Sequence, residues 1–181
     1  FALLQGFTEF IPVSSQGHLI IFNNFFNINI MSNITILEAN VIAHAGSLVA
    51  VCIYYSKQIF SLFISLRHIV RPDIDKNSTL VIQLIIATFP ILLCGFFFSK
   101  YFNYDDKSLL LIIGITSIFF GAILFFFDRF CLTVKGGREM NFLTSLFVGI
   151  FQCLALIPGV SRAGSIIIFL RFSGYNRNFA V

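Results

Sequence analysis

Two short stretches of the chain combine hydroxyl, ionisable and glycine residues within otherwise apolar sequence. The first has Glu9 and His18 on either side of two serines, and the second has Ser161 followed directly by Arg162. Ionisable groups inside apolar segments are costly unless they are paired, and they are candidates for function by default. An arginine fork beside a hydroxyl and unpaired backbone amides suits a phosphate group. These residues predict a site for a phosphate-bearing substrate, with Arg162 as its main ligand.

The two stretches are copies of one pattern. Ile11-Pro-Val-Ser-Ser-Gln-Gly-His-Leu-Ile-Ile-Phe22 aligns, with one residue inserted, to Ile157-Pro-Gly-Val-Ser-Arg-Ala-Gly-Ser-Ile-Ile-Ile-Phe169. The prolines disfavour helix before them and the glycines permit tight turns, so each copy predicts two short helices joined by an irregular tip. Free amides at the start of the second helix would join serine hydroxyls in an anion receptor. The receptor residues we single out are Ser14, Ser15, Gly17, Gly159, Ser161 and Gly164.

Membrane helices must position these tips. Of 181 residues 57% are apolar and 11% are charged, whereas about a quarter are charged in soluble domains. Uncharged runs at 79–98 and 108–127 are long enough to cross a bilayer, and a third span is expected at 39–56. The predicted fold class is therefore an all-α integral membrane protein, a polytopic helical bundle. The 12 Lys and Arg lie mainly between apolar runs, which argues against a nucleic-acid partner.

The order of spans and tips predicts inverted-topology repeats. Three spans separate the two copies, and an odd number of crossings reverses orientation, so re-entrant helix pairs should enter from opposite sides. We expect a single transmembrane domain over 1–181, with a first repeat at about 1–98 and a second, incomplete repeat from about 108 onward. Basic residues place 57–77 and 128–141 in the cytoplasm. The chain has no initial Met and ends in an apolar stretch, so we expect a fragment of a longer protein.

Each polar residue also has a structural interpretation. A Glu9–Arg162 ion pair would be purely structural, but it explains neither the serines nor the repeated helix breaks. His44 inside the third span fits an interhelical imidazole as well as a functional one, and Glu38 fits an interfacial carboxylate. Arg171 and Arg177 fit interfacial anchors.

Two longer motifs, Gln5-Gly-Phe-Thr-Glu-Phe-Ile-Pro-Val-Ser-Ser-Gln-Gly-His18 and Phe151-Gln-Cys-Leu-Ala-Leu-Ile-Pro-Gly-Val-Ser-Arg-Ala-Gly164, resemble the undecaprenyl-diphosphatase (bacitracin-resistance) family over essentially the whole chain. The resemblance implies a multi-pass bacterial inner-membrane hydrolase that removes a phosphate from undecaprenyl diphosphate, a polyprenyl lipid, and so recycles the carrier for peptidoglycan synthesis. It also implies catalytic roles for Glu9, Ser15, His18, Ser161 and Arg162, with Arg162 clamping the diphosphate. Glu9 would hold a divalent cation, Mg²⁺ or Ca²⁺, or act as acid or base, and a homodimer is expected.

The chain departs from the family pattern at several positions. Gln5 replaces the first glutamate of the acidic motif; four residues before Glu9, it shares a helix face with that carboxylate and is a weaker metal ligand. Glu38 is a candidate to replace the lost carboxylate. Ala163, Ile166 and Gln16 stand where the family has hydroxyl residues. A second hypothesis is therefore a lipid-phosphate transporter or binder without hydrolysis; a purely structural subunit would leave the polar groups unexplained.

Overall fold

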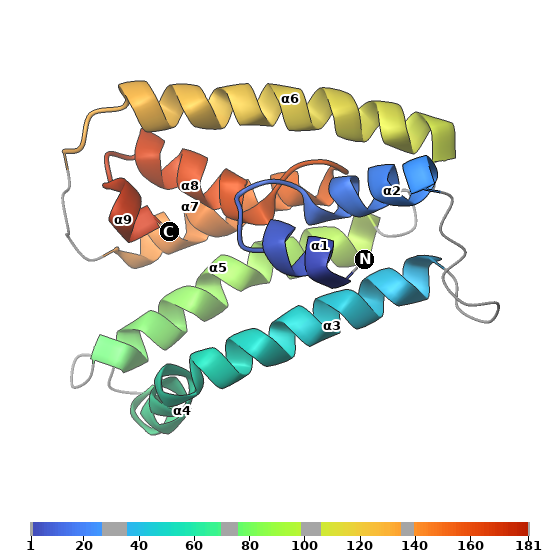
Figure 1. The fold of residues 1–181 in the computed structure, drawn as a ribbon. Coiled ribbons are helices and arrows are strands. Elements are labelled where there is room, and N and C mark those ends of the chain that lie inside the picture. Colours follow the sequence, from blue (N-terminus) through green and yellow to red (C-terminus); the bar gives the residue numbers. More distant parts are fainter. Residues whose placement is uncertain (1, 27–35, 70–75, 99–105, 135–139, 181) are drawn as a thin grey trace.

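The computed structural model describes residues 2–26, 36–69, 76–98, 106–134 and 140–180, and all regular structure in these ranges is helical (Figure 1). The predicted all-α class is confirmed. Short 3₁₀ turns follow α4 and α7, at Leu66–His68 and Cys153–Leu156. The α-helices are α1 (Ala2–Thr8), α2 (Ser15–Phe26), α3 (Ile36–Tyr54), α4 (Ser56–Ser65), α5 (Lys76–Phe98), α6 (Asp106–Phe130), α7 (Phe142–Gln152), α8 (Arg162–Phe172) and α9 (Arg177–Ala180).

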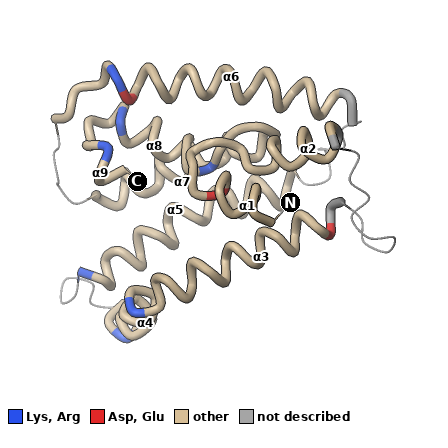
Figure 2. Tube along the Cα trace, in the orientation of Figure 1, with Lys and Arg blue, Asp and Glu red and all other residues tan. Residues whose placement is uncertain are grey.

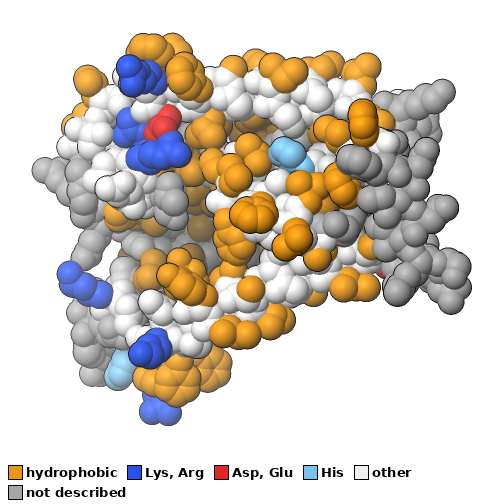
Figure 3. All heavy atoms as spheres, in the orientation of Figure 1, with side chains coloured by type: hydrophobic (Ala, Val, Ile, Leu, Met, Phe, Trp, Pro, Cys, Tyr) orange, Lys and Arg blue, Asp and Glu red, His pale blue; other side chains and the backbone are white. Residues whose placement is uncertain are grey.

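Two helices are long and apolar enough to cross a membrane. They are α5 and α6, over Lys76–Phe98 and Ser108–Phe130, each 23 residues. α3 and α4 pass the same test only as one broken span, because they meet at an angle of 78°. The predicted spans at 79–98, 108–127 and 39–56 thus correspond to α5, α6 and α3. Apolar side chains cover much of the outer surface, which suits contact with lipid (Figure 3).

The two copies of the repeated pattern form re-entrant helix pairs. α1 runs into the middle of the bundle, and α2 returns to the end from which α1 came (Figure 1). α7 enters from the opposite end, and α8 returns to that end. The prediction of re-entrant pairs with inverted orientation is confirmed. The exact repeat boundaries stay a prediction.

Basic residues gather at one end of the bundle. α4, the start of α5 and the end of α6 carry Lys or Arg there (Figure 2). The described parts of the two basic segments, 57–69 and 128–134, therefore share one side, as the topology requires; that this side is cytoplasmic stays a prediction. The rest of these segments, 70–75 and 135–139, and the connection at 99–105 lie outside the described residues.

α6 holds both tips by close backbone contact. Gly159 has a φ of +91°, and a Cβ there would lie 2.2 Å from Thr116 Oγ1. The same Thr116 oxygen lies 2.6 Å from the Pro158 carbonyl oxygen, within hydrogen-bond distance. On the first tip, a Cβ at Gly17 would lie 2.8 Å from Ile113 Cγ2. Glycine is therefore required at position 159, whereas a Cβ at position 17 would fit only if the Ile113 side chain moved.

Gly159→Ala is expected to lower the free energy of unfolding by more than about 1 kcal/mol, because both the positive φ and the contact with α6 exclude a Cβ. This should lower the melting temperature in detergent by at least about 2 °C. Gly114→Ala is the matched control, since nothing lies within 4 Å of a Cβ at that position of α6. Equal melting temperatures for the two variants would contradict the predicted requirement.

Arg171 ties the end of α8 to the end of α6. It is buried, and its Nε lies 3.5 Å from Asp128 Oδ1. Arg177, half-exposed, pairs with the same carboxylate. The interpretation of Arg171 as an interfacial anchor is therefore wrong, because its guanidinium is enclosed by protein acceptors. These are the carbonyl oxygens of Asp128 (3.1 Å), Cys131 (2.8 Å) and Tyr175 (2.8 Å) and the hydroxyl of Thr133 (3.1 Å).

Candidate active site

The two tips meet at a cavity of about 440 Å³, which we call the polar cavity. Its walls come from the end of α1, both tips, α3 and the start of α8. The segments around residues 9–16 and 155–163, far apart in sequence, thus share one site. The polar side chains that line it are those of Glu9, Ser14, Ser15, Gln16, His44, Ser161 and Arg162.

Each tip ends in the same helix cap. Ser14 Oγ accepts a hydrogen bond from the Gly17 amide at 3.4 Å, and Ser161 Oγ accepts one from the Gly164 amide at 3.2 Å. The amides of these two glycines are therefore satisfied within the protein. The first two amides of α2 and of α8 have no carbonyl one turn earlier in their helix, so they remain available to an anion. The anion receptor stays a prediction, and of its proposed donors the Gly17 and Gly164 amides are already used by the caps.

Glu9 is the centre of a hydrogen-bonded group. Its Oε2 accepts from Gln5 Nε2 at 2.9 Å and from Ser15 Oγ at 2.8 Å. The expected proximity of Gln5 to Glu9 is confirmed. Since the hydroxyl of Ser15 donates to a carboxylate, Glu9 is placed to take the proton of Ser15 when that oxygen attacks an electrophile.

Arg162, the first residue of α8, lines the same cavity as this group. Its side chain is exposed to the polar cavity, and no carboxylate among the described residues pairs with its guanidinium. The structural alternative of a Glu9–Arg162 ion pair is therefore not formed. The Arg162 donors remain available to a ligand.

The two histidines hold different positions. His18 Nδ1 lies 2.8 Å from the Ser14 carbonyl oxygen, and His18 lines a neighbouring cavity instead of the polar one. His44 lines the polar cavity, with Nδ1 2.8 Å from the Asn40 carbonyl oxygen and Nε2 3.6 Å from Glu9 Oε2. A carbonyl only accepts, so Nδ1 carries the proton of a neutral His44 ring. Its Nε2 and Glu9 Oε2 then attract each other only through a shared proton or a cation.

The carboxamide of Gln5 leaves an acceptor without a donor. Gln5 is fully buried, and its Oε1 has no hydrogen-bond partner in the described structure. This oxygen and Glu9 offer two neighbouring oxygen ligands, although no group of three or more His, Cys, Asp or Glu that could hold a metal occurs among the described residues. Glu38 lies exposed in the first turn of α3 and does not line the polar cavity.

Sequence reasoning did not assign the contributions of α3 and α6 to the site. For His44 the sequence left a functional and an interhelical role open. The only indication of function was that an ionisable group lies within an apolar span. Thr116 and Ser117, which contact the carbonyl oxygens of Pro158 and Gly159, gave no signal, because hydroxyl residues are common in membrane helices.

Comparison with known proteins gives consistent matches along the chain. The family model described as bacitracin resistance protein BacA matches residues 1–181. A protein of Aliivibrio salmonicida (strain LFI1238) named undecaprenyl-diphosphatase is 36% identical over 180 residues, which cover 99% of this chain and 66% of that protein. Proteins of the same name from Jannaschia sp. (strain CCS1) and Pelagibacter ubique (strain HTCC1062) are 34% and 35% identical and are covered to 66% and 63% of their lengths. The chain therefore spans slightly less than two thirds of these relatives.

Proposed function

Because the chain belongs to the bacitracin resistance protein BacA family, we propose that it hydrolyses undecaprenyl diphosphate to undecaprenyl phosphate and inorganic phosphate in the bacterial inner membrane. The product is the lipid carrier used in peptidoglycan synthesis. The single observation that carries the proposal is the Ser15 hydroxyl donating to Glu9 in a cavity also lined by Arg162, which has no carboxylate partner in the described part of the chain. Association into a homodimer stays a prediction.

The geometry favours Ser15 as the nucleophile. Its oxygen attacks the terminal phosphorus while its proton passes to Glu9 Oε2. The bond from that phosphorus to the bridging oxygen breaks, and undecaprenyl phosphate leaves with the electron pair. Water then hydrolyses the phosphoserine, releasing phosphate and restoring the Ser15 hydroxyl. Ser161 is less suited to this role, because its oxygen caps α8 and no carboxylate hydrogen bond prepares it.

Charge neutralisation is the second requirement of phosphoryl transfer. Arg162 supplies a forked donor, and the free amides at the starts of α2 and α8 add the positive ends of two helix dipoles. Both helices point their N-termini at the same cavity, because the re-entrant pairs enter from opposite ends. The diphosphate would thus meet donors on two sides.

We propose that a divalent cation binds at this site together with substrate. Glu9 and Gln5 Oε1 would hold it, with further oxygens from the diphosphate, as is usual for Mg²⁺. When bound, the cation supplies positive charge next to the phosphates. The residues of the chain carry out binding, orientation and proton transfer as described.

Gln5→Glu is expected to lower the Mg²⁺ concentration that gives half-maximal phosphate release. A second carboxylate next to Glu9 attracts the cation by about 1–4 kcal/mol, which corresponds to at least about fivefold less Mg²⁺ for half-maximal phosphate release. Titration of Mg²⁺ into chelator-treated protein measures this value. Identical midpoints for the variant and the unmodified protein would show that this pair does not hold the cation.

The alternative of a non-hydrolytic transporter or binder is not favoured. Such a protein would need the anion receptor but has no use for a carboxylate hydrogen-bonded to a serine in the same cavity. The names of the relatives also point to hydrolysis.

The decisive experiment is an assay of phosphate release from undecaprenyl diphosphate by the purified protein in its natural full length. We expect release with Mg²⁺ and a phosphoserine at Ser15 in acid-quenched samples incubated with β-³²P-labelled substrate. Absence of release at every Mg²⁺ concentration would contradict the proposed function. Release without a phosphoserine would support the hydrolase activity but contradict Ser15 as the nucleophile.

A further inference from the structure

α4 turns away from the direction of the membrane-crossing helices. α3 has 19 residues, which at about 1.5 Å per residue nearly match the hydrocarbon thickness, so α3 can cross the bilayer alone. α4 then meets α3 at an angle of 78° and is seen nearly end-on at the basic end of the bundle (Figure 1, Figure 2). α4 therefore lies close to the plane of the membrane, at the level where α3 leaves it.

Two tyrosines mark that level. Tyr54 ends α3 and Tyr55 precedes α4, and they are 79% and 47% exposed. Their rings contact each other edge to face, with centroids 4.8 Å apart. Tyrosine is enriched where the bilayer meets water, because its ring is apolar and its hydroxyl is polar. The bend between α3 and α4 thus coincides with the membrane interface.

One side of α4 is bonded to the first turn of α5. Asn77 Nδ2 donates to Ser61 Oγ at 2.9 Å, and Ser78 Oγ donates to the Ser65 carbonyl oxygen at 2.8 Å. Ser65 and Ser78 are both buried in this contact. α5 therefore holds α4 in place by its polar side, and the other sides of α4 face away from the described protein.

The outward sides of α4 combine apolar and basic residues. Phe60 and Phe63 are 66% and 69% exposed in the middle of the helix. Lys57 at its start and Arg67 just after its end are also exposed, and neither pairs with a carboxylate in the described ranges. No Asp or Glu occurs anywhere in 39–72. Hydrophobic and basic side chains thus lie side by side over this helix (Figure 3).

We propose that α4 lies in the bilayer surface and binds the headgroups of anionic phospholipids through Lys57 and Arg67, while Phe60 and Phe63 enter the acyl region. An apolar side flanked by cations is the pattern of helices that bind at this depth. The charge of the helix selects anionic over zwitterionic lipid, by about fivefold for each Lys or Arg near the headgroups. The proposal concerns a surface away from the polar cavity, so it stands independently of the proposed function.

The test measures which lipids surround α4 in the full natural protein. Phe63→Trp provides a fluorescent reporter, read as the difference from the unmodified protein, in vesicles of phosphatidylcholine and phosphatidylglycerol. Bromination of one lipid at a time gives the relative affinity of the site, since bromine quenches tryptophan on contact. We expect a preference of at least about fivefold for phosphatidylglycerol. Phe119→Trp is the matched reporter, because Phe119 is similarly exposed in the middle of α6, and it should show no preference. Phe63→Trp fluorescence that neither brominated lipid quenches would overturn the proposal, as expected if a protein partner covers α4.

Charge variants in the same reporter identify the headgroup ligands. Replacing both Lys57 and Arg67 with glutamine should reduce the preference to about twofold or less, while quenching by brominated phosphatidylcholine persists because the phenylalanine side still enters the membrane. Arg129→Gln, an equally exposed basic residue at the end of α6, should keep the full preference. Melting temperatures in neutral detergent should agree for all these proteins, which establishes that they are folded. An unchanged preference in the double variant would overturn the proposal. Displacement of phosphatidylglycerol by inorganic phosphate, beyond the effect of sodium chloride at equal ionic strength, would also overturn it, because the site would then bind a soluble anion.

Discussion

Phosphate release from undecaprenyl diphosphate is expected to fall by at least about 10³-fold when Arg162 is replaced with alanine. The guanidinium has no carboxylate partner among the described residues, and Arg162 lines the same polar cavity as the hydrogen-bonded Ser15 and Glu9. Its charge is therefore free to stabilise the phosphoryl oxygens as the bridging bond breaks. Arg162→Lys should recover only part of the loss, because an ammonium group lacks the forked geometry.

The matched control for this variant is Arg129→Ala. Arg129 lies exposed in the last turn of α6, so its removal changes the net charge equally without touching the polar cavity. Turnover by Arg129→Ala should stay within about twofold, since exposed charges interact weakly across solvent. Melting temperatures of both variants in detergent establish that they are folded. If the Arg162→Ala protein kept a tenth or more of the activity, the proposed role of Arg162 in the mechanism would be wrong.

The tips and spans were predictable because their determinants are local. Chain length at 1.5 Å per residue identifies a span, and Pro, Ser and Gly at fixed spacing determine where a helix stops and is capped. The caps at Ser14 and Ser161 follow directly from these rules, and so does the position of Arg162 one residue later. Inverted orientation followed from counting the spans between the copies.

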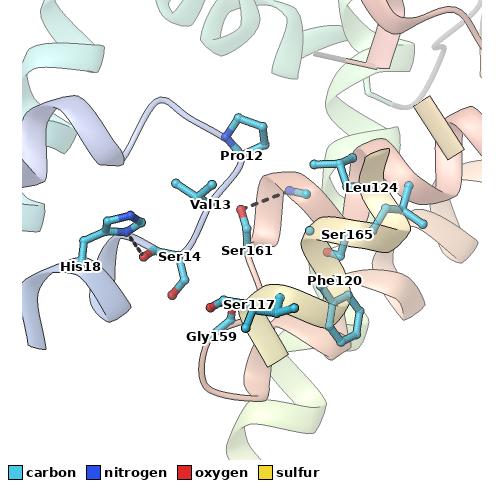
Figure 4. Close-up of a pocket in the computed structure, with 14 residues that line it drawn as sticks. Pro12, Val13, Ser14, His18, Ser117, Phe120, Leu124, Gly159, Ser161 and Ser165 are labelled. Carbon is cyan, nitrogen blue, oxygen red and sulfur yellow. Dashed lines mark hydrogen bonds between the residues drawn. The ribbon is translucent and has the colours of Figure 1, made fainter. Parts of the chain in front are cut away.

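The partners of the tips were not predictable, since they depend on which helices pack together. Closeness in sequence pointed to His18 as the histidine of the site, yet His18 lines a neighbouring cavity between the first tip, α6 and α8 (Figure 4), while His44 from α3 lies near Glu9. Arg171 similarly looked like an interfacial residue. Its burial depends on carbonyl oxygens about 40 residues earlier in the chain, and no local pattern encodes that meeting.

The repeat explains how one cavity acquires two different chemical groups. Ser15 and Arg162 are equivalent positions, each the first helical residue after a capping serine. Inverted entry places both at the centre of the bundle, where each helix start favours an anion. The first copy contributes a hydroxyl beside a carboxylate, and the second contributes a cation. A symmetric receptor for phosphate thus becomes an asymmetric site that can attack on one side and stabilise charge on the other.

Because the two copies contribute different groups, Glu9→Gln is the sharpest test of the first copy, which contributes the Ser15 hydroxyl and its base. Loss of the base should lower kcat by about 10²–10⁴-fold, because an amide cannot take the proton of Ser15. The KM should change far less, since Arg162 and the helix amides still bind the diphosphate. Glu38→Gln is the matched control: it removes the same charge from an exposed position outside the polar cavity and should leave turnover within about twofold. If both variants lost activity equally, the carboxylate of Glu9 would act only through long-range charge. Loss confined to Glu9→Gln that persists at saturating Mg²⁺, with no phosphoserine formed, assigns it to proton transfer, whereas recovery of turnover by added Mg²⁺ would assign it to the cation.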